Sequence, residues 1–256
     1  MRNYSFIIIL TVANHRKQLM TKDNRKYSII FLGVAFSLFL GSVQLSKTSC
    51  IAVFLMRWGA ISCLVLSSAY FFGKPLWVMG RTAAGVKCPQ WYLLFLFLNL
   101  PFLSVCWLVW LVRNVIIRKD AVSQIGETGI SISRWPVFDV PLKSYDLVID
   151  MTAEMPKLYR TRDRYILLPN LDGVPLTDWH LPCEIERGTS LLVHCAQGYG
   201  RSAVMAGMLL LKLGYVSSGE EAVALLKKYR KDIRLTKEQQ EQLYCFQSSG
   251  SSLARR

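Results

Sequence analysis

Acidic residues are almost missing from the first half of the sequence. The chain of 256 residues contains 17 Asp and Glu residues, and only Asp23 precedes residue 120. The other 16 lie in the remaining part, which we therefore expect to form a soluble domain. Hydrophobic residues make up 52% of the chain, which is too apolar for an ordinary soluble enzyme. We expect part of the acid-poor half to lie in lipid.

The cysteines lack the spacing of a metal site or a disulfide framework. They are seven in number, which is odd, and no two of them form a CxxC pair. The net charge is +14, but the basic residues form no long run and no stripe with interleaved aromatic residues. This pattern favours contact with a lipid bilayer and disfavours nucleic acid as a partner.

Residues 1–119 contain three apolar stretches with the length of membrane-spanning helices. An α-helix of about 20 residues crosses a bilayer. The stretches are Tyr27–Leu45, Ile51–Gly73 and Trp91–Val112. Arg57 interrupts the second stretch, so this one is either a short span or a re-entrant segment. We predict an all-α membrane region with about three transmembrane helices, and hence an integral, multi-pass membrane protein.

Residues 120–248 have the pattern of an α/β domain. After Arg201 the apolar spacing becomes helical, with one apolar helix over Ser202–Leu213 and capping boxes that begin at Ser218 and Thr236. Before it, four short segments read as strands. These are Gly129–Arg134, which alternates like a half-buried strand, and the apolar segments Leu147–Ile149, Tyr165–Leu168 and Leu191–His194. Residues 249–256 are rich in serine and are expected to be a disordered tail.

The segment 191–202 is an apolar strand that leads into a glycine-containing loop and then a helix. Such a loop binds phosphate, because its backbone N–H groups and the helix dipole point at an anion, and Gly198 and Gly200 let the backbone approach closely. Cys195 stands at the start of this loop, where the field favours the nucleophilic thiolate. Arg201, six residues later, can bind two phosphate oxygens.

These residues predict a phosphatase mechanism with a covalent intermediate. Cys195 attacks phosphorus and expels the alcohol or phenol, and water then hydrolyses the thiophosphate. Asp172 is the candidate acid that protonates the leaving oxygen. Ser202 would donate a hydrogen bond to the departing thiolate in the second step. His194 is expected to order the loop through hydrogen bonds. This chemistry needs no metal ion and no cofactor.

The loop resembles the signature of the dual-specificity branch of the cysteine-based protein tyrosine phosphatases, His-Cys-x-x-Gly-x-x-Arg-Ser/Thr. His194, Cys195, Gly198, Arg201 and Ser202 match every fixed position. The resemblance extends over roughly residues 126–246 and implies a central β-sheet flanked by α-helices. It also implies that the loop binds the substrate phosphate through Ala196, Gln197, Gly198, Tyr199, Gly200 and Arg201.

Two features of this segment depart from the family. The stretch between Asp172 and Cys195 is shorter than usual, so Asp178 is the alternative acid. The variable loop positions carry no additional Lys or Arg, which disfavours a polyphosphoinositide substrate; these positions are Ala196, Gln197, Tyr199 and Gly200.

The first functional hypothesis is a membrane-anchored phosphatase that acts on phosphorylated tyrosine, serine or threonine in proteins. The alternative is a phospholipid phosphatase, because the Asp172-Gly-Val-Pro segment is also similar to the phosphatidylglycerophosphate phosphatase group. A third hypothesis is a non-catalytic scaffold that binds phosphorylated partners.

The orientation of the catalytic domain depends on the number of spans. With three spans the distribution of basic residues places the domain outside the cell, whereas a thiolate nucleophile favours the reducing cytosol. The conflict disappears if the stretch with Arg57 does not fully cross. We expect a cytosolic domain.

Overall fold

The computed structural model describes residues 21–47, 49–81, 89–116, 121–137, 140–156, 165–177, 179–181 and 183–250. The expected start of the catalytic domain at Asp120 and the alternative acid Asp178 lie outside these residues. At the other end of the chain, helix α8 continues to Gly250, so the first two residues of the expected tail are helical.

The acid-poor half forms helices, as its apolar stretches predicted. They are α2 (Lys22–Gln44), the 3-10 turn η2 (Leu45–Lys47), α3 (Cys50–Phe71), the short α4 (Leu76–Met79), α5 (Pro89–Leu111) and the π-helical turn η4 (Val112–Ile116). Thr21 and Ser49 cap α2 and α3, because each side chain accepts a hydrogen bond from the backbone N–H three residues later. Among the described residues, three helices are long and apolar enough to cross a membrane.

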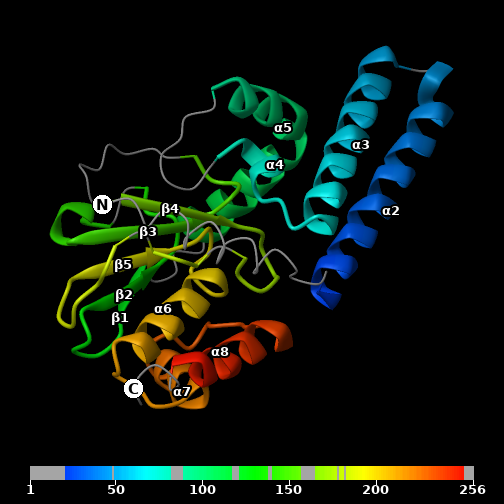
Figure 1. Ribbon diagram of the computed structural model, residues 1–256. Helices are drawn as coiled ribbons and strands as arrows, with labels where there is room; N and C mark the ends of the chain where they lie inside the picture. The colour runs from blue at the N-terminus through cyan, green and yellow to red at the C-terminus, as the bar shows by residue number, and fades with distance from the viewer. Residues whose placement is uncertain are drawn as a thin grey trace, which may run out of the picture.

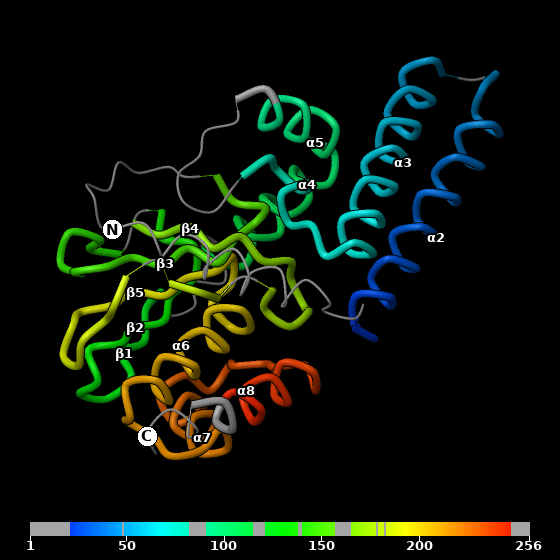
Figure 2. The backbone as a smooth tube through the Cα atoms, in the orientation of Figure 1, coloured from blue at the N-terminus to red at the C-terminus, as the bar shows by residue number. Residues whose placement is uncertain are grey.

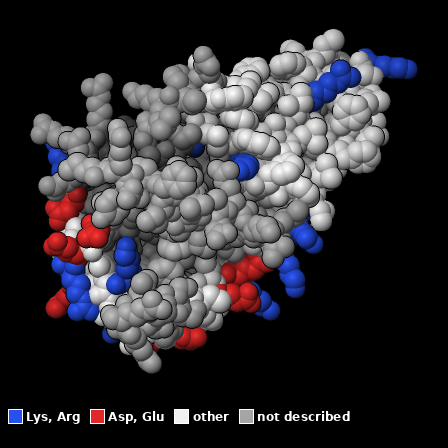
Figure 3. All heavy atoms as spheres, viewed as in Figure 1, with Lys and Arg blue, Asp and Glu red and all other residues white. Residues whose placement is uncertain are grey.

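Two of these helices form an antiparallel hairpin that projects from the rest of the molecule. Figure 1 shows α2 leaving the catalytic domain and α3 returning to it, while α5 lies closer to the domain. Large apolar side chains are exposed along both helices of the hairpin, for example Phe36 and Phe54. The surface of the hairpin is nearly free of charge between its far end and the catalytic domain (Figure 3). This surface suits the interior of a bilayer.

The second half contains a five-stranded mixed sheet in the order β1-β2-β5-β3-β4. The strands are β1 (Val122–Gln124), β2 (Ile130–Ser133), β3 (Leu147–Thr152), β4 (Tyr165–Asn170) and β5 (Leu191–His194). β1 pairs antiparallel with β2, and the other neighbours are parallel. β5 therefore lies in the middle, and the loop after it begins at the carboxyl end of the parallel strands, where α/β sheets place their ligand sites.

The burial of β2 differs from the expectation. The alternating segment Gly129–Arg134 predicted a strand with one solvated face, but all four residues of β2 are buried. Elements outside the sheet cover β2: α6 packs against it, and the polar side chains of Ser131 and Ser133 are enclosed as well. The expectation of a half-buried strand was wrong.

Three helices follow the sheet: α6 (Arg201–Lys212), α7 (Gly219–Tyr229) and α8 (Lys237–Gly250). They gather beside the sheet on the side away from α5, as the tube in Figure 2 shows. The capping box at Thr236 is complete, whereas at Ser218 the side chain of Glu221 accepts from the N–H of Ser217 instead of that of Ser218. Ser218 accepts from the N–H of Glu221, and Thr236 and Gln239 each accept from the backbone N–H of the other. Almost all of α6 is buried, so the helix that starts at the loop is held rigidly in the core.

Candidate active site

The loop from Cys195 to Gly200 connects β5 directly to α6. Gly198 has a φ of +73°, and a Cβ there would lie 2.8 Å from the backbone of Ser133 and Arg134. Glycine is therefore required at this position both by the backbone conformation and by the close approach of the end of β2. The first turn of α6 follows at once, so its unpaired N–H groups and positive dipole face the loop.

Cys195 is buried at the centre of this loop. The N–H of Gly198 donates to its sulfur over 3.2 Å, and the hydroxyl of Ser202 lies 3.3 Å from the sulfur. Hydrogen bonds to sulfur stabilise the thiolate, which is the form that attacks. The structure therefore brings the predicted nucleophile and the predicted Ser202 together.

Arg201 is the largest fully buried side chain, and two acidic side chains hold it. Its Nη atoms lie 2.8 and 2.5 Å from the carboxylate of Glu154, and its Nε lies 3.1 Å from Oδ1 of Asp172. Burial alone would lower the pKa of Arg201, but Asp172 and Glu154 outweigh it and raise the pKa well above its ordinary value. The guanidinium is thus permanently charged and fixed in direction, as a phosphate clamp requires.

Asp172 comes to the site on a turn that follows β4. Its side chain is 67% exposed, whereas Arg201 beside it is buried. The next residue, Gly173, has a φ of +74°, and the hydroxyl of Tyr70 in α3 donates to the carbonyl oxygen of Asp172 over 3.0 Å. An accessible carboxyl next to the phosphate clamp has the placement that a general acid needs.

The comparisons agree with this geometry. Residues 181–249 match the family described as dual specificity phosphatase, catalytic domain. The match is confined to these residues, which are similar to the catalytic domain of this family. No curated protein matches the chain.

Solved phosphatase structures cover about half of the chain. A crystal structure of PTPMT1 in complex with PI(5)P is 21% identical, with a TM-score of 0.41, and the match covers 53% of this chain and 99% of that one. Tk-PTP in its active form is 19% identical with a TM-score of 0.39, covering 50% and 97%. The human tyrosine phosphatase-like serine/threonine/tyrosine-interacting protein is 14% identical with a TM-score of 0.40, covering 51% and 98%.

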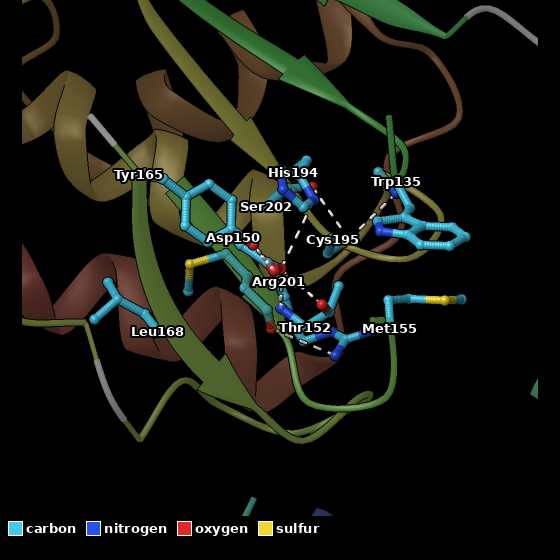
Figure 4. Close-up of polar contacts among 12 residues, drawn as sticks. Trp135, Asp150, Thr152, Met155, Tyr165, Leu168, His194, Cys195, Arg201 and Ser202 are labelled. Carbon is cyan, nitrogen blue, oxygen red and sulfur yellow. Dashed lines mark hydrogen bonds and ion pairs between the residues drawn. The ribbon is translucent and has the colours of Figure 1, made fainter. Parts of the chain in front are cut away.

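His194 of the phosphatase signature lies against a buried carboxylate. Its Nδ1 is 3.8 Å from Oδ1 of Asp150, which pairs with it across β3 and β5. Burial lowers the pKa of His194 below its ordinary value, although the charge of Asp150 opposes this effect. Figure 4 shows Asp150, Thr152, Tyr165 and His194 close together beside Cys195. We therefore propose that His194 supports the loop together with Asp150.

The membrane half contacts the variable positions of the phosphatase loop. Asn114, in the turn after α5, donates to Oε1 of Gln197 over 3.3 Å. Arg113 lies over the ring of Tyr199 at 5.6 Å. Ala196 packs with Trp110 of α5 in a small buried cluster. Three of the four variable loop positions, Ala196, Gln197 and Tyr199, thus lie against the end of α5 and the turn after it.

Three supporting residues were missed in the sequence: Glu154, Arg81 and Tyr70. Glu154 follows β3 by two residues, and this position just beyond a buried strand was a signal that could have singled it out. No comparable signal marks Arg81, which looks like one more basic residue after an apolar segment. Tyr70 looks like an ordinary residue of an apolar helix.

A cavity of about 250 Å³ lies beside Arg201, between the membrane helices and the phosphatase domain. Its walls are apolar and aromatic side chains from α2, α3, α4 and α5 together with Ala153 and Leu171. Its polar end is formed by Glu154 and Asp172, the two acids that hold Arg201. The cavity therefore begins at the proposed acid and extends among the membrane helices.

Proposed function

We propose that this protein is a membrane-bound, cysteine-dependent phosphatase that hydrolyses the phosphate monoester of a membrane lipid. The observation that carries the lipid part of this proposal is the apolar cavity beside Asp172. The phosphatase family supports the reaction type, and the nature of the alcohol is inferred from the cavity.

The reaction proceeds in two steps. The thiolate of Cys195 attacks phosphorus while the loop N–H groups and Arg201 bind the phosphoryl oxygens; the ester P–O bond breaks, and Asp172 gives its proton to the leaving oxygen. Water then attacks the cysteinyl phosphate, Asp172 accepts a proton from it, and the P–S bond breaks to release inorganic phosphate. Ser202 donates its hydrogen bond to the returning thiolate.

The position of the acid indicates where the alcohol lies. Because the acid must reach the leaving oxygen, the alcohol leaves toward Asp172, and that side opens into the cavity. Pockets for drug-sized ligands measure about 300–1,000 Å³, so a cavity of about 250 Å³ takes the part of a lipid next to its phosphate and not the whole molecule.

A lipid suits this cavity better than a phosphopeptide. The helices that line it carry exposed apolar side chains on their outer faces, so a lipid can arrive along the bilayer, whereas a peptide would have to bring its polar backbone between those helices. The loop has no additional cation for a second phosphomonoester, which favours a lipid with a single phosphomonoester group.

The placement of the helices also supports a cytosolic phosphatase domain. The start of α2 contacts α8, since the N–H of Lys22 donates to Glu238 over 2.8 Å, and the end of α3 contacts the turn with Asp172. The hairpin of α2 and α3 therefore crosses and returns to the same side.

The end of α5 lies next to the phosphatase domain, and its start packs against α4, after which Arg81 reaches Asp150 of that domain. A Cβ at Gly80, the residue before Arg81, would lie 2.6 Å from the backbone nitrogen of Tyr92, so the start of α5 packs against the end of α4. At the other end Trp107 donates to the carbonyl of Glu154 over 3.0 Å. We propose that α5 lies along the boundary between domain and membrane and does not cross, so that only α2 and α3 span the bilayer.

This arrangement removes the conflict over orientation. Among the described residues, two basic side chains belong to the far part of the hairpin, Lys47 and Arg57. Those on the side of the domain are Lys22, Arg25, Lys26, Lys74, Arg81 and Arg113. The positive-inside rule then places the domain in the cytosol, where a thiolate nucleophile stays reduced.

The experiment compares three substrates with the full chain in detergent micelles: phosphatidylglycerophosphate, a phosphotyrosyl peptide and a small aryl phosphate. We expect a higher kcat/KM for the lipid than for the peptide. Cys106→Phe, which fills the cavity, should lower lipid turnover at least tenfold and leave the aryl phosphate unchanged.

Val105→Phe is the matched control, because this neighbouring side chain on α5 is exposed on the outer face. A preference for the peptide, or equal effects of Cys106→Phe and Val105→Phe, would reject the lipid proposal. Turnover of all three substrates that survives Cys195→Ser would reject the mechanism itself.

A further inference from the structure

Arg81 extends from the membrane half into the phosphatase domain. It follows α4, and its side chain is only 7% exposed. One Nη atom donates to Oδ2 of Asp150 over 2.8 Å and to the hydroxyl of Tyr165 over 3.3 Å. The other donates to the side chain of Thr152 over 3.0 Å and to the backbone carbonyls of Thr152 and Met155. One guanidinium thus binds two strands and the segment after β3.

The first set of contacts leads to the nucleophile. Oδ1 of Asp150 accepts hydrogen bonds from the N–H and the hydroxyl of Thr152, at 2.8 and 2.6 Å, and lies beside His194. His194 directly precedes Cys195. A carboxylate in this position needs a counter-charge, because it is buried among uncharged groups. Arg81 provides this charge and thereby fixes the base of the catalytic loop.

The second set leads to the phosphate clamp. Arg81 binds the carbonyl groups at both ends of the segment from Thr152 to Met155. Glu154 lies within this segment, and its carboxylate binds both Nη atoms of Arg201. The direction of the Arg201 guanidinium therefore depends on a segment that Arg81 holds in place.

We propose that Arg81 is a positioning residue through which the membrane half completes the phosphatase site. It acts on Arg201 through Glu154 and on Cys195 through Asp150 and His194, and it touches no reacting atom. The inference does not depend on the lipid substrate, because it concerns the phosphate-binding loop and applies to any monoester.

If Arg81 only stabilised the fold through its ion pair with Asp150, its removal would have a different effect. Removing such a pair would lower the thermal midpoint and leave phosphate affinity unchanged in the molecules that stay folded. A positioning residue must also change how tightly the folded site binds the phosphate group, since the clamp loses its fixed direction.

The test uses the full chain in detergent micelles, a small aryl phosphate as substrate and inorganic phosphate as inhibitor. We expect Arg81→Met to raise the inhibition constant for phosphate and the KM at least tenfold. Lys74→Met is the matched control, because it removes an exposed cation from the same connection between α3 and α5, and both constants should stay as in the wild type.

If the Arg81→Met variant does not fold, Arg81→Lys tests the same proposal. Lysine keeps the charge for Asp150 but cannot bind Tyr165, Thr152 and Met155 together, because it lacks the planar fork. We expect a phosphate inhibition constant several-fold above that of the wild type. Wild-type constants in a folded Arg81 variant, with only a lower thermal midpoint, would overturn the proposal.

Discussion

The hydroxyl of Tyr70, near the end of α3, donates a 3.0 Å hydrogen bond to the backbone carbonyl of Asp172. This bond joins a membrane helix to the turn that carries the proposed acid. The side chain of Asp172 is exposed, whereas its neighbours Leu171 and Val174 are buried and anchor the turn. The membrane half of the chain is thus part of the frame that holds the acid.

We expect Tyr70→Phe to impair the acid and not the nucleophile. Loss of one hydrogen bond of about 1 kcal/mol should slow hydrolysis of an alkyl phosphate roughly five- to tenfold. An aryl phosphate with an acidic phenol needs little protonation and should be affected less than twofold. Steady-state rates for both esters test this, and an equal loss for both would show that Tyr70 serves the loop instead.

Ser202→Ala should separate the two chemical steps. The hydroxyl lies 3.3 Å from the sulfur of Cys195, where it assists the thiolate as leaving group. Attack on the substrate should remain fast while hydrolysis of the cysteinyl phosphate slows by about tenfold or more. Rapid mixing with an aryl phosphate should then show a burst of about one phenol per site. A slow first turnover without a burst would contradict this role.

The stability of the protein should fall on acidification below about pH 6.5, the ordinary pKa of histidine. Burial keeps the pKa of His194 below this value in the folded state. The unfolded chain therefore binds a proton that the folded chain does not, and the contribution present above pH 6.5 is lost as the pH falls, by up to about 1.4 kcal/mol per pH unit. Thermal midpoints from pH 7.5 to 5.5 measure the effect.

His194→Asn should flatten this part of the pH dependence, because asparagine takes up no proton. His180→Asn is the control, since His180 is exposed and should leave the slope as in the wild type. Equal slopes for the wild type and His194→Asn would mean that His194 takes up its proton in the folded protein as readily as in the unfolded chain.

The sequence predicted the phosphatase loop well because its determinants are local. Strand β5, Gly198 and the start of α6 are consecutive in the chain, so spacing alone indicates their geometry. Arg81 and Glu154 could not be found in this way. Their roles arise only when segments far apart in the sequence meet, Arg81 with Asp150 and Glu154 with Arg201.

In the acid-poor half, too, the sequence predicted local structure but not contacts between distant segments. Hydrophobic length indicated three helices, and three such helices are present. Length does not show where the ends of a helix lie, and the placement of the end of α5 beside the phosphatase domain depends on contacts such as that of Trp107 with Glu154. The half-buried pattern of β2 failed for a related reason, since sequence alternation does not reveal which elements pack on the faces of a strand.

Native cysteines can test the proposed orientation. Cys50 is exposed at the far end of the hairpin, and Cys245 is exposed on α8. In sealed inside-out vesicles from the cytoplasmic membrane, a membrane-impermeant maleimide should label a variant that keeps only Cys245. A variant that keeps only Cys50 should react only after detergent is added. Labelling of both variants without detergent would show that the hairpin does not cross.

The turn that carries Asp172 should require glycine at Gly173, whereas another glycine with a positive φ, Gly188, should be replaceable. An alanine there is strained by the φ of +74° and collides with the Tyr27 ring, whose Cζ would lie 2.7 Å from the added Cβ. Gly188 has a φ of +83° but no atom within 4 Å of such a Cβ, so Gly188→Ala measures the backbone strain alone, about 1 kcal/mol.

We expect Gly188→Ala to keep full activity with a slightly lower thermal midpoint. Gly173→Ala should displace Asp172 and lower kcat at least tenfold for an alkyl phosphate, with little change in the inhibition constant for inorganic phosphate. This difference follows because the turn carries the acid while the loop from Cys195 to Gly200 binds the anion. Equal kinetics for the two variants would show that the contact between the turn and α2 does not position the acid.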